Sequence, residues 1–175
     1  MKNFAFSIIK SYPTGTVARP LKGTTGSAGY DFKCPKYSSY FRGRLFEVNN
    51  GSVVANVKSE GIVLKAGSRI VIPSGLRFRL PEHMAFISFE KSGLATKDGI
   101  VPTCRVVDSD YQGELCIGLA NISQKDYTII YGNKIAQYLL LPIADDELLE
   151  VDDDCIFSGV SSERGKGGFG STGNK

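Results

Sequence analysis

Short runs of β-branched, aromatic and other apolar residues recur along most of this chain, separated by Gly, Pro, Asn or Asp. Five of these runs are predicted to be strands: residues 69–72, 76–80, 84–89, 115–119 and 134–141. Long helical periodicity is scarce, and the best short helix covers residues 92–97, with Ser92 as its N-cap. Many short strands with closely spaced turns predict an all-β fold, either a sandwich, a jelly roll or a barrel.

Two further segments have a distinct local character. Asn50-Gly51 lies between two β-like runs and predicts a two-residue hairpin, because both turn positions require a positive φ. Residues 158–175 are rich in glycine and almost free of apolar side chains, so burial cannot offset the entropy of ordering them. We therefore expect a β domain over residues 1–157, followed by a mobile Gly-rich C-terminal arm over residues 158–175.

Composition and charge narrow the class of protein. The 175 residues are 42% hydrophobic and 22% charged, which is ordinary for one globular domain. A net charge of +3 is compatible with an anionic substrate and does not favour a dedicated DNA-binding protein, so no stable nucleic-acid partner is expected. The apolar runs are too short to cross a bilayer, and residues 1–4 begin no signal core. We expect an intracellular, cytoplasmic protein, with the nucleus as the other option.

The cysteines and the histidine limit the available chemistry. Four cysteines are widely spaced and do not form a C-x-x-C pair, which favours incidental thiols over a disulfide scaffold or a zinc site. His83 is the only histidine, which excludes His-dependent triads and multi-histidine metal sites. Acid–base chemistry must therefore come from carboxylates, lysine, tyrosine or cysteine.

The tail combines glycines with groups that bind phosphate and bases. Residues 165–170 satisfy a bare G-x-G-x-x-G, but no helix can follow before the chain ends, which excludes a dinucleotide fold. Glycine amides can close on phosphate oxygens, Arg164 can bind them bidentately, and Phe169 can stack on a base. The segment therefore suits a phosphate-clamping lid, although its composition also suits a plain flexible tail.

Two internal segments carry candidate polar groups. Asp108 follows an apolar run, where a carboxylate can be partly desolvated and rigidly held, as a general base requires. The same segment also reads as a polar turn between two strands. Lys91-Ser92-Gly93 is either an ordinary helix start or an anion site made of a cation, a hydroxyl and backbone amides.

The order of these segments resembles the five motifs of the trimeric dUTPases. They are Ala28-Gly29-Tyr30-Asp31, Ser92-Gly93-Leu94-Ala95, Asp108-Ser109-Asp110-Tyr111-Gln112-Gly113, residues 132–137 and residues 164–173. The resemblance implies a distorted jelly-roll β-barrel that assembles as a homotrimer, with each active site built from all three chains. It also implies hydrolysis of dUTP to dUMP and pyrophosphate, which limits uracil in DNA and supplies dUMP for dTMP synthesis.

The resemblance assigns roles to single residues. Asp108 would be the general base that activates a water for in-line attack on the α-phosphorus. Tyr111 would pack under the deoxyribose and exclude a 2′-hydroxyl. The segment Lys91-Ser92-Gly93, together with Gln137, would bind the phosphate oxygens. Uracil would be read by backbone groups of residues 99–107.

The remaining roles fall on the metal and the arm. Asp31 would lie near the hydrated Mg²⁺ that accompanies the triphosphate, so that it contacts the metal through water. Arg164 would clamp the terminal phosphates, and Phe169 would cover the uracil. Gly170 and Ser171 would complete the cage around the phosphates.

The chain departs from the family pattern at three places. Glu90-Lys91 replace the usual Pro-Arg, so the charge is kept but the bidentate fork is lost. Arg105 replaces a glycine that borders the hairpin expected to read uracil, around residues 99–107. Arg105 is a candidate substitute for the arginine that Lys91 replaces. Residues 33–59 are longer than the family norm, and we interpret them as an extra surface hairpin.

Two other functions use the same fold. A dCTP deaminase would keep the phosphate cage but need a catalytic Glu beside the pyrimidine. A catalytically impaired nucleotide-binding or signalling protein would be supported only by Lys91 and Arg105. The intact segment from Asp108 to Tyr111 and the aromatic Gly-rich tail favour an active dUTPase.

Overall fold

The computed structural model describes residues 4–36, 46–49, 52–53, 56–144 and 147–167. Its strands are β1 (Ala5–Ile8), β2 (Leu21–Lys22), β3 (Tyr30–Lys33), β4 (Phe46–Asn49), β5 (Ser52–Val53), β6 (Asn56–Val57), β7 (Gly61–Leu64), β8 (Arg69–Pro73), β9 (Leu76–Arg79), β10 (Met84–Phe89), β11 (Ile100–Pro102), β12 (Val106–Val107), β13 (Cys116–Asn121), β14 (Tyr127–Ile130) and β15 (Lys134–Pro142). The five strands predicted from the hydrophobic pattern are confirmed as β8, β9, β10, β13 and β15.

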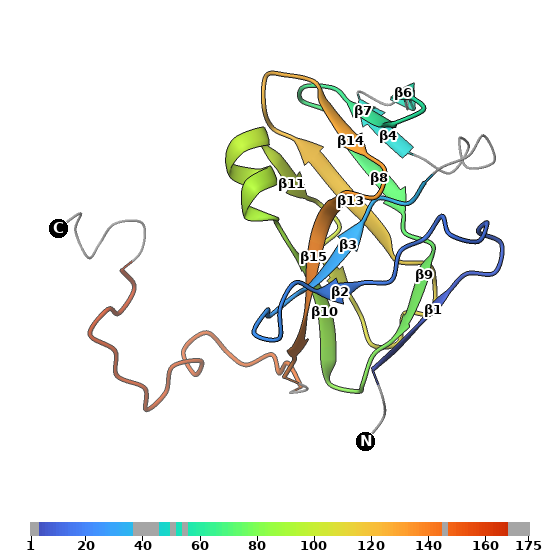
Figure 1. Ribbon diagram of the computed structural model, residues 1–175. Coiled ribbons are helices and arrows are strands. Elements are labelled where there is room, and N and C mark those ends of the chain that lie inside the picture. Colours follow the sequence, from blue (N-terminus) through green and yellow to red (C-terminus); the bar gives the residue numbers. More distant parts are fainter. Residues whose placement is uncertain (1–3, 37–45, 50–51, 54–55, 145–146, 168–175) are drawn as a thin grey trace. The chain divides into compact units, whose positions relative to one another are not determined.

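The strands pair antiparallel in four sheets. One five-stranded sheet has the order β12-β10-β15-β3-β2, and a second has the order β11-β13-β8-β4-β5. Strand β15 lies in the middle of the first sheet, between β10 and β3 (Figure 1). Smaller sheets consist of β14-β7-β6 and β1-β9. Since each described pair is antiparallel, this arrangement confirms the predicted all-β class.

Aromatic side chains fill the core beneath the first sheet. Phe86 of β10 is fully buried, and its ring centroid lies 5.1 Å from that of Tyr138 on the neighbouring β15. Phe78 of β9 and Phe4 approach the same ring at 5.2 and 5.4 Å, respectively. Burying a side chain of this size contributes about 1.5–3 kcal/mol relative to leaving it exposed. The cluster therefore fixes β9, β10 and β15 against one another.

The predicted hairpin at Asn50-Gly51 is supported by its flanking strands. Asn49 of β4 pairs with Ser52 of β5, which leaves a two-residue connection. Asn50 and Gly51 themselves lie outside the described residues. Strand β4 also pairs with β8, so part of the segment 33–59 is built into the second five-stranded sheet.

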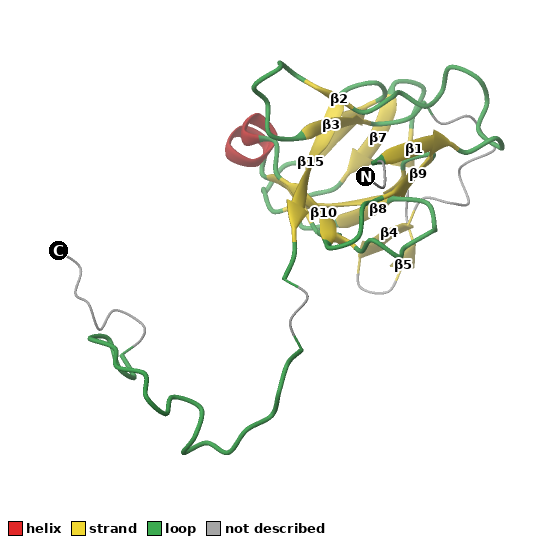
Figure 2. Cartoon of the chain, turned by 90° about the horizontal axis from the view of Figure 1, so that it is seen from below, coloured by secondary structure: helices red, strands yellow, loops and turns green. Residues whose placement is uncertain are grey.

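One short helix is present in the described part of the chain, and its helical residues 92–98 confirm the helix predicted at residues 92–97, although the predicted cap is not found. The π-helix η2 (Leu94–Asp98) lies outside the strands (Figure 2). Its N-cap is Gly93, and no side chain caps it, so the prediction of Ser92 as N-cap was wrong. Ser92 instead contributes its carbonyl oxygen, which accepts a hydrogen bond from the Thr96 hydroxyl at 2.6 Å. Gly99, with φ of 68°, ends the helix.

The chain divides into two compact units, Met1–Ala144 and Asp145–Lys175. The first unit contains all the sheets. In the described part of the second unit the chain forms turns, and the Arg164 guanidinium donates to the Gly167 carbonyl at 2.9 Å. The domain boundary that the sequence suggests after residue 157 stays a prediction. None of the helices within the described ranges has the length and hydrophobicity to cross a bilayer.

Candidate active site

One polar pocket gathers three of the segments singled out in the sequence. It has a volume of about 570 Å³ and lies where β3, β10 and β15 end beside the loop that precedes β3. Its lining residues are Gly23, Ser27, Ala28, Gly29, Asp31, Phe89, Glu90, Lys91, Ser92, Lys134, Gln137 and Leu139. We call it the lysine pocket. Residues far apart in the sequence meet here because β15 pairs with both β3 and β10.

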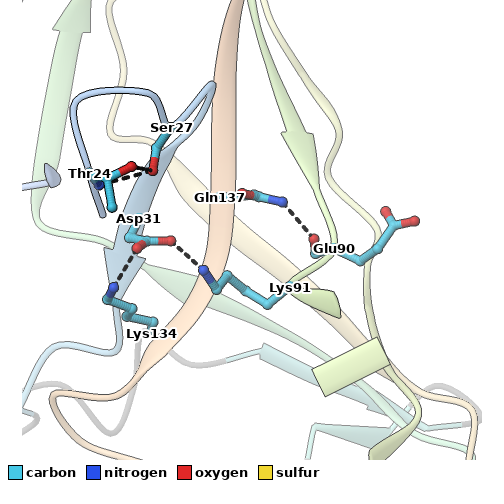
Figure 3. A network of polar contacts seen from close by, with 7 residues as sticks. All are labelled: Thr24, Ser27, Asp31, Glu90, Lys91, Lys134 and Gln137. Carbon is cyan, nitrogen blue, oxygen red and sulfur yellow. Dashed lines mark hydrogen bonds and ion pairs between the residues drawn. The ribbon is translucent and has the colours of Figure 1, made fainter. Parts of the chain in front are cut away.

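A carboxylate between two lysines dominates the lysine pocket. The Lys91 ammonium lies 2.5 Å from Asp31 Oδ1, and the Lys134 ammonium lies 2.6 Å from Asp31 Oδ2 (Figure 3). Asp31 is 9% exposed, whereas the side chains of Lys91 and Lys134 are 26% and 48% exposed. Burial raises the pKa of Asp31, but hydrogen bonds and charge from Lys134 and Lys91 outweigh burial and hold it below its usual value. The group therefore carries excess positive charge at neutral pH.

A β-bulge directs Lys134 into this pocket. Lys134 pairs with Lys33 of β3, but the register then shifts, and Ala136 pairs with Phe32. In a regular strand Lys134 and Gln137 would face opposite sides, because they are an odd number of residues apart. An inserted residue reverses that alternation, so both side chains line one pocket.

Gln137 is held by the strand on its other side. Its side-chain amide donates to the Glu90 carbonyl at 2.9 Å (Figure 3). A Cβ on Gly29 would lie 2.9 Å from Leu139 and 3.2 Å from the Gln137 side-chain oxygen. A larger residue here would push against the side chains of Leu139 and Gln137 on β15. The Gln137 side chain is thereby fixed against the wall of the pocket.

A second pocket contains the residues of the Asp108 segment. It has a volume of about 210 Å³ and is lined by Cys104, Val106, Val107, Asp108, Tyr111, Leu115 and Cys116. We call it the Tyr111 pocket. Asp108 directly follows β12, a two-residue strand at the edge of its sheet. Asp108 is exposed, so the expected partial desolvation is not found in the chain by itself. The short edge strand leaves no second layer to cover the carboxylate.

The turn after Asp108 positions the Tyr111 ring. The Tyr111 backbone N–H donates to the Asp108 carbonyl at 3.2 Å, and the Tyr111 hydroxyl donates to the Glu114 carbonyl at 2.8 Å. A Cβ on Gly113 would lie 2.3 Å from the Tyr111 hydroxyl oxygen. The ring therefore passes over Gly113, where a side chain would displace it, and it remains 47% exposed beside the pocket.

The structure separates the predicted site residues into groups. The lysine pocket contains Asp31, Lys91, Ser92 and Gln137, and Gly93 follows it as the N-cap of η2. The Tyr111 pocket contains Asp108 and Tyr111, and the two linings share no residue. Arg164 belongs to the second unit. Phe169, Gly170 and Ser171 lie outside the described residues.

Two residues of interest were missed or left open by the sequence. Lys134 was not selected as a site residue, although a lysine after the Gly132-Asn133 turn, at the start of the longest apolar run, was a usable signal. Arg105 lies with its guanidinium 5.7 Å from the centroid of Phe89, which lines the lysine pocket. It is exposed, and a cation–π contact holds it beside that pocket.

The donor set of the lysine pocket suits an anionic ligand better than a bare cation. No cluster of three or more His, Cys, Asp or Glu occurs in the described ranges. Both oxygens of Asp31 face ammonium groups. A divalent ion accompanied by phosphates, and contacting Asp31 through water, would fit these residues, whereas direct coordination by several carboxylates would not.

Comparisons with known proteins point to one family. The family model described as dUTPase matches residues 56–173. The deoxyuridine 5'-triphosphate nucleotidohydrolase of Fusobacterium nucleatum is 42% identical over 159 residues, covering 90% of each chain. The fold is similar to that of the dUTPase of Staphylococcus bacteriophage 80alpha with dUPNHPP, with a TM-score of 0.72, 21% identity and 99% of each chain covered.

A second solved structure has the same fold. It is a variant of the dUTPase from phage phi11 of S. aureus, in which the coordination of a structural Mg(II) ion was described. The TM-score is 0.64 and the identity 19%, over 86% of this chain and 97% of that one. These likenesses confirm the predicted jelly-roll fold.

Proposed function

The chain belongs to the dUTPase family, and we propose that it cleaves dUTP to dUMP and pyrophosphate at a site formed by the lysine pocket and the Tyr111 pocket. The observation that carries this proposal is the lysine pocket itself. Residues of three family motif segments meet there around an excess of positive charge. Such a pocket matches the charge and the hydrogen-bonding needs of a triphosphate.

In the proposed complex the phosphates occupy the lysine pocket. The Ser92 hydroxyl and the Gln137 amide are hydrogen-bond donors in the pocket lining, and the next residue, Gly93, has no atom within 4 Å of where a Cβ would lie. Lys91 and Lys134 supply charge, and their pairing with Asp31 keeps both ammonium groups in place before the substrate binds. Donors fixed in advance are the main source of electrostatic catalysis, and one such donor is worth about 3 kcal/mol.

The nucleoside and the attacking water are assigned to the Tyr111 pocket. Tyr111 offers an exposed ring, held by its hydroxyl, against which the deoxyribose packs. Asp108 accepts a proton from the water that attacks the α-phosphorus, and pyrophosphate leaves. Uracil is recognised by backbone groups of residues 99–107. Bound substrate and a neighbouring chain would supply the desolvation that Asp108 lacks in one chain.

The separation of the two pockets supports a homotrimer with shared active sites. Neither pocket holds the complete set of motif residues, so one chain forms only parts of a site. In the proposed assembly the lysine pocket of one chain meets the Tyr111 pocket of another. The arm of a third chain contributes Arg164, Phe169, Gly170 and Ser171.

Mg²⁺ is the cofactor that fits this arrangement. It would arrive on the triphosphate and contact Asp31 through water, since the lysines occupy both carboxylate oxygens. When bound, it neutralises charge that develops on the phosphate oxygens. The intracellular, cytoplasmic location that the sequence suggests stays a prediction.

The departures from the family pattern are compatible with this function. Lys91 retains the charge of the usual arginine and is held by Asp31. Arg105 is placed beside Phe89 at the edge of the lysine pocket, which supports its role as a substitute cation for the phosphates.

Replacing Asp108 tests the proposal against an impaired nucleotide-binding protein. Asp108→Asn should abolish turnover of dUTP while binding of a non-hydrolysable dUTP analogue is largely kept. Asp110→Asn is the matched control, because Asp110 is an exposed carboxylate of the same segment outside the pocket lining, and it should retain turnover. Near-normal turnover of Asp108→Asn would refute its role as base. A wild-type protein that binds the analogue without turnover would favour the impaired alternative.

A further inference from the structure

Two of the four cysteines line the Tyr111 pocket. Cys104 is exposed in the segment between β11 and β12, and Cys116 is half-buried at the start of β13. The other two are placed differently. Cys34 is buried, and its burial raises the pKa of the thiol to about 12, whereas Cys155 belongs to the second unit. The pocket that holds Asp108 and Tyr111 therefore also holds two thiols.

The geometry of β13 places both thiols on one side of the sheet. Cys116 and Gly118 are two residues apart on β13, so they face the same side. A Cβ on Gly118 would lie 2.5 Å from Cys104 Sγ and 2.8 Å from the Cys104 backbone nitrogen. The chain therefore crosses over Gly118 at Cys104, on the side that Cys116 also faces. Glycine at this position is what allows the crossing.

The backbone around Cys104 is fixed from the opposite strand. The Ser88 hydroxyl donates to the Cys104 carbonyl at 3.0 Å, and the Ser88 backbone N–H donates to the Arg105 carbonyl at 2.8 Å. Both thiols also lie close enough to the buried Tyr138 hydroxyl for their charge to raise its pKa, along with burial, which is the larger cause. Cys104 is thus held near Cys116 rather than on a freely moving loop.

We propose that Cys104 and Cys116 form a dithiol site that a low-molecular-weight disulfide oxidises to an intramolecular disulfide, which blocks the Tyr111 pocket. The Cys104 thiolate attacks one sulfur of the small disulfide, releases one small thiol and leaves a mixed disulfide. The Cys116 thiolate then attacks the Cys104 sulfur and releases the second small thiol. The protein loses two protons and two electrons, and the small disulfide gains them.

The dithiol site goes beyond dUTP hydrolysis, and only its effect on turnover rests on the proposed function. A bond between Cys104 and Cys116 joins two walls of the pocket that Tyr111 and Asp108 also line. The pocket volume is only about 210 Å³, so a small displacement of its walls removes the space for a pyrimidine nucleoside. Reduction by a dithiol reagent reverses the change.

The test uses the full chain with Cys155→Ser, so that the thiols counted are those of the first unit. The protein is incubated with oxidised glutathione, denatured, alkylated and weighed by mass spectrometry. The proposal predicts that two thiols escape alkylation, that the mass equals that of the reduced protein plus one alkyl group less two hydrogen atoms, and that a peptide linking Cys104 to Cys116 appears. Cys34 is buried and its thiol has a high pKa in the folded protein, so oxidised glutathione should not react with it. It should therefore still be alkylated once the protein is denatured.

Single variants and turnover complete the test. With Cys104→Ser or Cys116→Ser added, the remaining thiol can carry at most a glutathione adduct, and the linked peptide must be absent. Glutathione adducts on both thiols of the parent, or full alkylation of both, would overturn the dithiol site. Oxidised parent protein should lose most of its dUTP turnover and regain it with dithiothreitol. A linked peptide without loss of turnover would contradict the proposal that the disulfide blocks the pocket. The alkylation and peptide measurements test formation of the disulfide even if the reduced protein does not hydrolyse dUTP.

Discussion

At the scale of single residues, Asp31 and its two lysines determine the charge of the lysine pocket. A mostly buried carboxylate is costly unless its charge is paired, and here each oxygen has its own ammonium group. The two pairs orient Lys91 and Lys134 toward the pocket centre before any ligand enters. The family resemblance places Asp31 near the metal ion. In the chain without ligand, Asp31 instead holds the two lysines that give the pocket its positive charge.

This pairing makes stability depend on pH. Because the folded pKa of Asp31 lies below its usual value of 3.8, the folded state favours the ionised form. Its stabilisation is fully present above that value and is lost as the pH falls through the lower folded pKa. Urea unfolding at a series of pH values should show this loss in the wild type and a smaller one in Asp31→Asn. Equal acid sensitivity of the two proteins would contradict the pairing.

Lys134 should contribute to substrate binding. Lys134→Ala removes a charge from the pocket and leaves Asp31 with one partner, so KM for dUTP should rise about tenfold, as expected for a lost charge-assisted hydrogen bond. Lys134→Arg should restore part of the loss. Lys33→Ala is the control, since Lys33 pairs in register with Lys134 but lies outside the pocket lining. Steady-state kinetics that show equal KM values for Lys134→Ala and Lys33→Ala would contradict this role.

The sequence could identify many site residues but not their partners. Asp31, Lys91, Ser92 and Gln137 were selected by motif order, and the structure brings them together. Lys134 was missed because its side chain reaches the pocket through a bulge, which a regular alternation does not predict. The exposure of Asp108 depends on β12 being a short edge strand, a tertiary property that local pattern does not encode.

At the scale of elements, long strands were predictable and short ones were not. Strands β10 and β15 have continuous apolar runs, and their bounds were predicted to within one residue. Strands β2, β5, β6 and β12 are two residues long, too short for a periodic pattern to identify them, so their identity as strands rests on the strand that each one pairs with. Local pattern also does not report the pairing of β14 with β7, since more than sixty residues separate Thr128 from its partner Val63.

Gly61 should be essential for the pairing of β7 with β14. A Cβ at Gly61 would lie 2.2 Å from the Ile129 carbonyl oxygen, and a backbone atom cannot move aside without breaking the ladder. Gly61→Ala should lower the free energy of unfolding by about 2–4 kcal/mol, in the range of severe steric changes in a core. Gly26→Ala, where the added Cβ meets no atom within 4 Å, should be nearly neutral. Chemical denaturation giving equal values for both variants would show that the strands separate more easily than described.

At the scale of the whole molecule, the two pockets support the proposal that the functional unit contains more than one chain. Both pockets lie within the first unit, yet the residues proposed to bind the phosphates and those proposed to bind the nucleoside line different ones. The proposed closed symmetric assembly would bring unlike pockets of neighbouring chains together. The prediction of a trimer came only from family resemblance, because no local pattern reports how identical chains meet.

Shared sites should allow inactive variants to complement each other. Asp108→Asn disables the Tyr111 pocket, and Gln137→Ala disables the lysine pocket. Refolding the two together in equal amounts should produce mixed trimers in which about a quarter of the sites combine two intact pockets. Turnover should recover to that extent. Mixing Asp108→Asn with Tyr111→Ala, which damages the same pocket, should restore nothing, and absence of recovery in the first mixture would contradict sharing.

The most direct measurement of the central claim is release of pyrophosphate by the purified protein from dUTP, dCTP, dTTP and UTP, compared side by side with Mg²⁺. We expect rapid turnover of dUTP alone, because in the proposed site Tyr111 would exclude a 2′-hydroxyl and the backbone of residues 99–107 would exclude other bases. Comparable turnover of dCTP or dTTP would show that Arg105 has altered the recognition of the base. No turnover of dUTP by protein that still binds its analogue would contradict the assignment of a dUTP-hydrolysing enzyme.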